Sequence, residues 1–96
     1  MIRIRRLHWD EWNVAHIARH DVTPEEAEEV CHGSFILLHS TKGRAIIVGP
    51  TRRGRLLAVV LAPEPEEEDT YYPVTARPAA RKERRVYRER KGGEHA

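Results

Sequence analysis

The chain has 96 residues, of which 40% are hydrophobic and 33% are charged, and a chain of this length holds one hydrophobic core. The one cysteine, Cys31, excludes an intrachain disulfide and a cysteine metal cluster, and the apolar run at 56–62 is far shorter than the roughly 20 residues of a membrane-spanning helix. We therefore expect a soluble, cytoplasmic protein without cofactor or metal, built as a single domain over residues 1–91 with a flexible tail over 92–96.

Charge is segregated along the chain although the totals nearly cancel. Seventeen Lys and Arg residues against 15 Asp and Glu residues give a formal net charge of +2. Arginines open the chain at positions 3, 5 and 6, acidic residues dominate a solvated loop at 64–69, and basic residues crowd 77–91. A polyanion would therefore meet a local basic surface near the C-terminus.

The N-terminal part of the chain predicts a short strand and a helix. Isoleucine and arginine alternate over residues 2–5, the period of a half-buried edge strand. A helix is expected from the N-cap Asp10 to about His20. Its apolar residues at helical spacing are Trp9, Trp12, Val14 and Ile17.

A second helix begins with the clearest local motif of the sequence. Thr23 supplies an N-cap, Pro24 suits the first helical position, and Glu26 completes a capping box. We expect Gly33 to end this helix in the left-handed conformation. Its apolar stripe consists of Ala27, Val30 and Cys31.

Four short apolar or β-branched runs follow and predict an antiparallel sheet of about four strands. The runs are 35–38, 45–48, 56–62 and 71–76. The first three are joined by tight turns at 41–43 and 51–54, where glycine tolerates positive φ. Pro73 lacks a backbone donor, so its strand should be an edge strand or bulged there.

The chain closes with a predicted surface helix over 79–91, which is basic and poor in apolar residues. The predicted fold class is therefore α+β: two N-terminal helices, the sheet and a basic C-terminal helix. The stretch 49–54 superficially resembles a phosphate loop but lacks the Gly-Lys-Ser/Thr ending, which excludes nucleotide binding there.

Several short motifs, in this order and spacing, carry a family resemblance across nearly the whole chain. They are Trp9-Asp10-Glu11, Arg19-His20-Asp21-Val22, the helix at 25–30, His39-Ser40, Val48-Gly49, Gly54-Arg55-Leu56-Leu57, Thr75-Ala76-Arg77 and the Ala-Xaa-Arg-Xaa-Glu-Arg-Xaa-Xaa-Tyr pattern at 79–87. Together they resemble the BrnT toxin family, whose fold is similar to that of RelE-type ribonucleases. The chain departs from the family at Asp21, at Trp12 and Asn13, and in the segment after His39.

The resemblance implies the toxin of a type II toxin–antitoxin system: a metal-independent endoribonuclease that cleaves free or ribosome-associated RNA, blocks translation and inhibits growth. It implies that Arg55, Arg77 and Arg84 belong to the functional set, together with Arg44. The implied partner is a small, DNA-binding antitoxin similar to BrnA, with a dimer or a heterotetramer as candidate assemblies.

Arginine suits RNA cleavage because its planar fork of donors stays charged and binds two phosphate oxygens at once. An antiparallel sheet would bring Arg55 and Arg77 to one face, and Arg84 and Tyr87 are helical neighbours that would face one phosphate. His39 is the preferred histidine because it leads into a basic hairpin. The candidate RNA-binding residues are Lys42, Arg44, Arg81, Arg85 and Arg88.

Structural alternatives stand beside each assignment. The arginines would then form salt bridges at the sheet edge, Tyr87 would pack in the core, and Glu83 would pair with Arg88 or Lys82. His16 and His20 have metal-ligand spacing but no third ligand. The alternative function is a non-catalytic module of the same fold that binds nucleic acid or protein.

Overall fold

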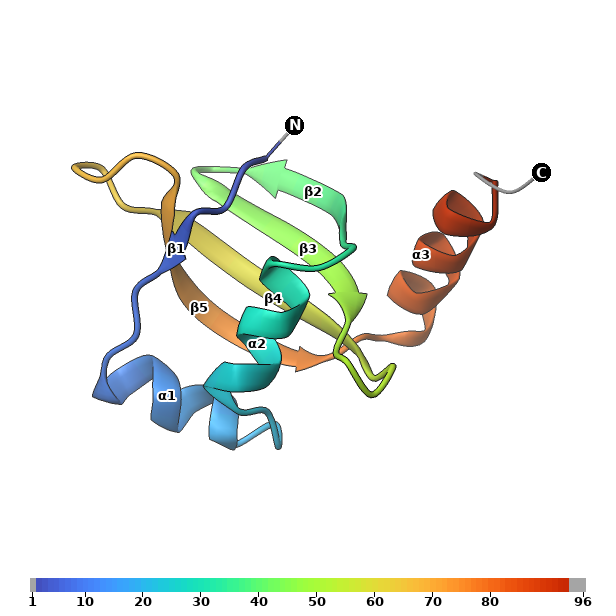
Figure 1. Cartoon of the computed structure of the whole chain (residues 1–96), viewed down its shortest axis with the longest axis horizontal. Helices are drawn as coiled ribbons and strands as arrows, with labels where there is room; N and C mark the ends of the chain where they lie inside the picture. Colours follow the sequence, from blue (N-terminus) through green and yellow to red (C-terminus); the bar gives the residue numbers. More distant parts are fainter. Residues whose placement is uncertain (1, 94–96) are drawn as a thin grey trace.

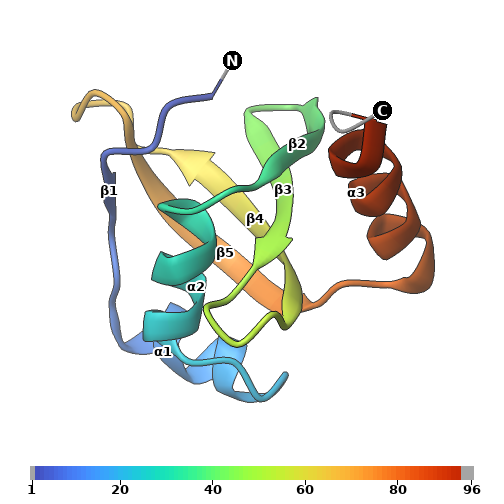
Figure 2. The ribbon, with the colours of Figure 1, turned by 45° about the vertical axis from the view of Figure 1, so that its right-hand side comes forward.

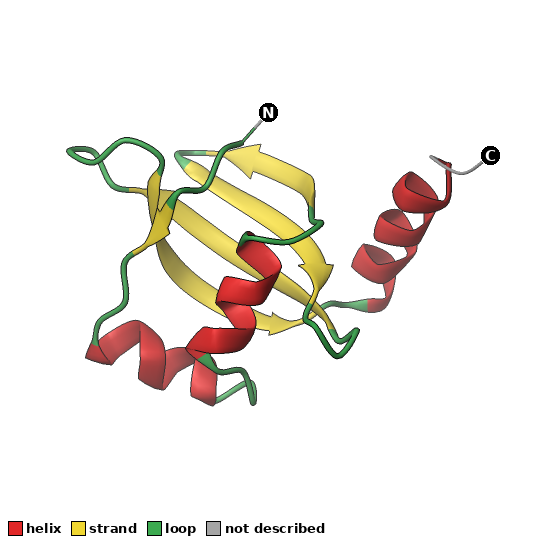
Figure 3. Ribbon diagram, viewed as in Figure 1, coloured by secondary structure: helices red, strands yellow, loops and turns green. Residues whose placement is uncertain are grey.

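The computed structural model describes residues 2–93 and has an α+β fold with three helices and one five-stranded sheet (Figure 1; Figure 3). The elements follow in the order β1 (Arg6–Leu7), α1 (Glu11–Ala18), α2 (Pro24–Cys31), β2 (Ile36–Thr41), β3 (Arg44–Pro50), β4 (Leu56–Pro63), β5 (Thr70–Pro78) and α3 (Arg81–Gly93). The flexible tail was predicted to begin at residue 92, but Gly92 and Gly93 belong to α3. Residues 94–96 lie outside the described range. No helix within residues 2–93 is long and apolar enough to cross a membrane.

The predicted α+β fold is confirmed: the four predicted strands are present as the antiparallel strands β2 to β5, and β1 adds a short parallel edge strand that makes the sheet mixed. Its strand order is β1-β5-β4-β3-β2; β2 to β5 pair antiparallel with their sequence neighbours, and β1 pairs parallel to β5. The short edge strand predicted at 2–5 lies later in the chain, since the residues that pair with β5 are Arg6 and Leu7. Ile2 and Ile4 pack against the core without a strand partner, so their alternation indicated burial rather than pairing.

Helix α1 starts at the predicted cap but buries a different stripe. Asp10 accepts the backbone N–H of Asn13 at 2.9 Å, and the Asn13 side chain accepts the backbone N–H of Asp10 at 2.9 Å. Of the predicted apolar set, Ile17 is buried and Trp9 packs against the core, whereas Trp12 and Val14 are exposed and Asn13 is buried in their place. A buried asparagine is tolerated here because its amide also donates to the carbonyl of His8.

Helix α2 confirms its predicted start and corrects its predicted end. The capping box of Thr23 and Glu26 is present, and Ala27, Val30 and Cys31 are buried. Gly33 does not have positive φ, since the helix ends at His32. A glycine is needed there for another reason: a Cβ would lie 2.7 Å from the carbonyl oxygen of Glu29.

The turns of the sheet follow their glycines. Lys42 and Gly43 both have positive φ (49° and 73°), as a two-residue hairpin turn of this kind requires, and Gly54 has a φ of 85°. Pro73 is not on an edge strand, since β5 lies between β1 and β4. Its predicted bulge is present: the β4–β5 register shifts between Val60 and Leu61, and Leu61 pairs with Pro73.

The sheet separates two apolar clusters. Figure 2 shows α1 and α2 together and α3 apart from them, and the contacts place the first two on one face of the sheet and α3 on the other. The main core lies under α1 and α2 and includes Ile17, Val30, Ile47, Leu57, Val59, Leu61 and Ala76. A smaller cluster holds α3 and includes Ile36, Val48, Ala58, Ala79, Val86 and Tyr87.

Gly49 marks the closest approach of the sheet to the α2 end. A Cβ there would lie 2.9 Å from Phe35 Cβ, 3.0 Å from Phe35 Cα and 3.2 Å from Val30 Cγ1. We expect Gly49→Ala to lower the free energy of unfolding by about 1–3 kcal/mol, because buried backbone must shift. Urea denaturation measures the loss. Gly92→Ala is the control, since nothing lies within 4 Å of its added Cβ; equal effects of the two changes would contradict this packing.

Candidate nucleic-acid interface

The predicted catalytic arginines lie on opposite faces of the sheet. Ala58, in the α3 cluster, pairs with Arg77, which places Arg77 on the α3 face. Leu57 belongs to the main core, and Arg55 precedes it by two residues on the same side. The expectation that Arg55 and Arg77 share a face is therefore wrong, and the three arginines that the resemblance assigns to the functional set, Arg55, Arg77 and Arg84, do not gather in one site.

Arg55 instead ties the α1–α2 connection to the sheet. Its Nη1 lies 3.1 Å from a carboxylate oxygen of Glu26 and 2.7 Å from the carbonyl oxygen of Asp21. Burial acts to raise the pKa of Glu26, but hydrogen bonds from the Thr23 backbone and from Arg55 outweigh it, and the pKa lies below its usual value. The Arg55 guanidinium therefore has a structural role in the fold.

Arg77 forms a two-pronged ion pair, as the structural alternative expected, but with Glu83, which therefore does not pair with Arg88 or Lys82. Its Nη1 and Nη2 lie 2.7 and 2.9 Å from the two carboxylate oxygens of Glu83, at the first turn of α3. The same carboxylate accepts the backbone N–H of Ala80 at 2.7 Å. Glu83 is thus three residues after Ala80, the spacing of half a capping box, and this spacing was the available signal.

This pair shifts both titration equilibria. The hydrogen bond from Arg77 holds the pKa of Glu83 below its usual value, against the opposing effect of burial. The hydrogen bond to Glu83 raises the pKa of Arg77. Both groups stay charged at neutral pH, so Glu83 is a poor proton acceptor and Arg77 a permanent cation.

Further contacts fix the sheet-facing side of α3. Arg84 donates to the carbonyl oxygen of Ala79 at 2.7 Å, and Tyr87 donates to that of Ser34 at 3.0 Å. One turn further on, Arg90 donates to the carbonyl oxygen of Leu37 at 2.7 Å. In this arrangement Arg84 and Tyr87 bind backbone carbonyls rather than facing a common external anion.

The opposite side of α3 is basic and exposed. Arg81, Arg85 and Arg88 follow one another at four- and three-residue spacing, which aligns them along one stripe of the helix. Lys82 flanks them, and all four side chains are exposed. No ion pair within residues 2–93 involves these four residues. We call these four residues the basic stripe.

His39 is remote from Arg77. It is exposed on β2 and shares a cross-strand row with Ile46, Val60 and Thr75. Because β2 and β5 are three strand spacings apart, His39 lies about 14 Å from Thr75 across the sheet. One phosphate cannot touch both His39 and Arg77. Lys42 and Arg44 are exposed beside the same hairpin and form a separate basic site.

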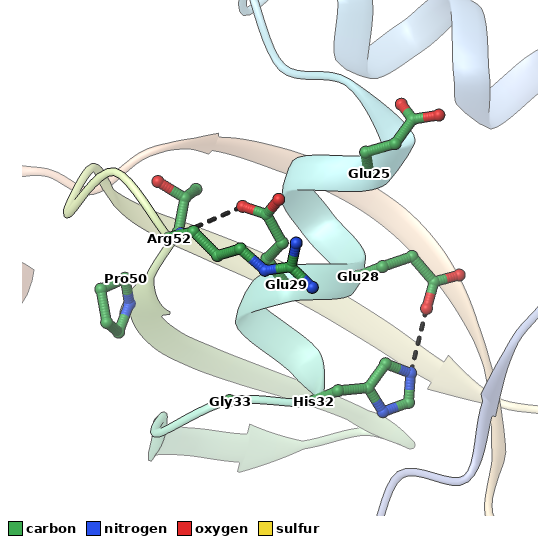
Figure 4. A pocket seen from close by; sticks show the side chains of 8 residues that line it. Glu25, Glu28, Glu29, His32, Gly33, Pro50 and Arg52 are labelled. Atoms are coloured by element: carbon green, nitrogen blue, oxygen red, sulfur yellow. Dashed lines mark hydrogen bonds and ion pairs between the residues drawn. The ribbon is translucent and has the colours of Figure 1, made fainter.

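The other side of the sheet carries an acidic hollow. It has a volume of about 550 Å³ and lies between α2 and the β3–β4 turn (Figure 4). In Figure 4 Glu29 accepts the backbone N–H of Arg52, and Glu28 contacts His32. With Glu25, three glutamates line this hollow against one arginine, Arg52, so its balance of charge disfavours a polyanion. Within residues 2–93 no three His, Cys, Asp or Glu side chains are grouped to hold a metal ion.

Comparison with protein-family models, with curated proteins and with solved structures finds no match to this chain.

Replacement of Glu83 tests the anchor of α3. Because the folded-state pKa of Glu83 is lowered, its ionisation stabilises the fold above the ordinary value of 4.5, and this contribution disappears as pH falls through the folded-state pKa. We expect Glu83→Gln to cost about 1–2 kcal/mol at neutral pH and progressively less in acid. Thermal unfolding across pH measures the difference.

The control is Glu89→Gln on the exposed side of the same helix. It should be close to neutral at every pH. A Glu83→Gln effect that stays constant from neutral to strongly acid pH would show that ionisation of Glu83 plays no part in holding α3.

Proposed function

We propose that this protein binds RNA through the basic stripe of α3. One observation carries the proposal: α3 is fixed to the sheet by Glu83, Tyr87 and Arg90, so its other side presents unpaired cations in a fixed orientation. Cations that no internal carboxylate neutralises are free to replace the counterions of a phosphate backbone. The resemblance to BrnT toxins favours RNA as the polyanion.

The distribution of charge supports the same surface. The α2 side carries the acidic hollow, whereas the α3 side carries the basic stripe and Arg77. A polyanion is therefore drawn to one side of the molecule and repelled from the other, although the net charge is only +2. The sheet lies between the acidic hollow and the basic stripe and keeps the two charged surfaces separate.

Salt dependence tests the binding proposal. With three phosphate contacts, the logarithm of the affinity for a single-stranded RNA should fall with the logarithm of salt at a slope of about −2. Each of Arg81→Ala, Arg85→Ala and Arg88→Ala should reduce that slope by about 0.7. Fluorescence anisotropy of a labelled oligonucleotide measures both quantities.

Arg55→Ala is the matched control, because it removes an arginine from the opposite face. It should lower stability and leave the RNA affinity of the folded protein unchanged. Equal loss of affinity in Arg55→Ala and Arg85→Ala would show that the attraction is diffuse and not located on α3.

A second candidate function is the endoribonuclease toxin that the resemblance implies. The observation that favours it is the position of Arg77: its side chain is 35% exposed on the sheet face that carries the basic stripe. Arg77 binds Glu83 at the first turn of α3, where the stripe begins at Arg81, so an RNA strand that runs along the stripe and past Arg81 would approach a guanidinium suited to the extra negative charge of a pentavalent phosphate.

The same geometry limits the chemistry. Glu83 has a lowered pKa and His39 lies on a distant strand, so neither is placed to take the 2′-hydroxyl proton beside Arg77. The reaction would then depend on charge stabilisation and positioning, with modest turnover. A metal-independent toxin of this kind would be slow without a further group from the ribosome or the substrate.

Cleavage is tested with purified protein and RNA in a chelator. If Arg77 stabilises the transition state, Arg77→Ala should lower the rate of cleavage about a hundredfold, and Arg77→Lys should restore little because lysine lacks the two-pronged fork. Circular dichroism must show both variants folded. Cleavage that persists undiminished in folded Arg77→Ala would remove Arg77 from the mechanism, and an absence of cleavage with retained binding would favour the non-catalytic module.

An antitoxin partner belongs to this same proposal. A cognate antitoxin similar to BrnA would have to cover the basic stripe to block RNA, so the segment that contacts α3 should be acidic. Such a segment would neutralise in the complex the cations that remain unpaired in the free chain.

A further inference from the structure

The outer side of α1 is an unpartnered surface on the opposite side of the sheet from α3. Trp12 is 59% exposed there. The described chain exposes two large hydrophobic residues, and Trp12 is the more exposed of them. Its ring stacks on His16 at 5.0 Å between centroids and 6° between planes. An aromatic side chain already held by a neighbour loses little entropy on contact, which is typical of residues that anchor an interface.

Ala15 lies at the centre of this surface. It is exposed and faces away from the buried pair Asn13 and Ile17. The surface forms a shallow hollow of about 420 Å³, with Ala15 at its middle. The residues that line it are Glu11, Trp12, Ala15, His16 and Arg19. A small central residue allows another helix to approach closely.

The charges at the two ends of the hollow are opposite and unpaired. Glu11 lies four residues before Ala15, and Arg19 lies four residues after it. Eight residues of helix separate them by about 12 Å, so they cannot pair with each other. Neither forms an ion pair within the described chain.

We propose that this surface binds a second copy of the same chain through antiparallel packing of two α1 helices. A two-fold axis at Ala15 places Glu11 of each copy opposite Arg19 of the other, which forms two equivalent ion pairs. The same axis brings Trp12 of each copy onto the far half of the other hollow, near Arg19. Because the opposite charges lie at the two ends of the surface, the surface is complementary to a second copy of itself in antiparallel orientation.

The dimer should be weak. Two helices of eight residues bury less than the roughly 1,200 Å² of stable complexes, so we expect a dissociation constant of about 10–100 µM. The basic stripe of α3 lies on the other face of the sheet and stays free. The dimer would therefore present two RNA-binding stripes at once, but its formation does not depend on RNA binding.

Sedimentation equilibrium of the full chain, from about 10 µM to 1 mM, tests the proposal. The wild type should self-associate, and Trp12→Ala should weaken the dimer at least tenfold. Glu11→Arg and Arg19→Glu should each be monomeric, because each places like charges across the axis. The double variant Glu11→Arg/Arg19→Glu should recover the dimer.

The decisive experiment mixes the two single variants. Glu11→Arg then offers two arginines and Arg19→Glu offers two glutamates, so the mixture should form a heterodimer although neither variant associates alone. Circular dichroism controls for folding, since all three positions are exposed. A wild-type chain that stays monomeric at the highest concentration, a dimer unaffected by these changes, or a mixture that remains monomeric would each overturn the proposal.

Discussion

The ion pair between Arg77 and Glu83 determines where the last helix lies, and the candidate function depends on that position. β5 ends at Pro78, and only two residues separate it from α3. Across this short link the carboxylate binds both the strand's arginine and the backbone N–H of Ala80, so one side chain fixes the direction in which the helix leaves the sheet. Arg90 then holds the helix against β2, and Tyr87 holds it against Ser34 in the segment before that strand. The basic stripe points outward because these contacts occupy the opposite side.

Arg55 performs the equivalent task on the other face, where Glu26 and the carbonyl oxygen of Asp21 bind it. Two of the arginines that suggested catalysis are therefore, first of all, ties between a helix and the sheet. The resemblance to a toxin family does not distinguish these roles, because an arginine retained for folding and one retained for phosphate binding give the same motif. The contacts distinguish them: Arg55 is bound by the carbonyl of Asp21 and the carboxylate of Glu26, whereas Arg77, although paired with Glu83, keeps 35% of its side chain exposed.

Local features of the fold were predictable from the sequence. The capping boxes at Asp10 and Thr23 and the glycine at position 43 act within a few residues, and each was identified or partly identified by spacing alone. Features that depend on the register of the strands were not predictable from the sequence. The register between β4 and Pro78 determines on which face Arg55 lies. Packing across the whole sheet sets that register. The exposure of Trp12 was missed for a related reason, because the buried polar Asn13 takes the position that an apolar residue was expected to fill.

Separation of tasks between the two faces explains how a chain of 96 residues with nearly balanced charge can offer distinct surfaces. The acidic side chains Glu26, Glu28 and Glu29 stabilise α2 and the turn beside it. All three form their contacts on the face that carries the main core. α3 contributes only Val86 and Tyr87 to its apolar cluster and is held by polar contacts as well, and the cations on its other side form no ion pair within the described residues. A helix built in this way is costly as a structural element unless a polyanion or an acidic partner covers it, since like charges at 81, 85 and 88 repel one another. Binding of either would relieve this repulsion, so the feature that weakens the isolated helix would favour such a complex.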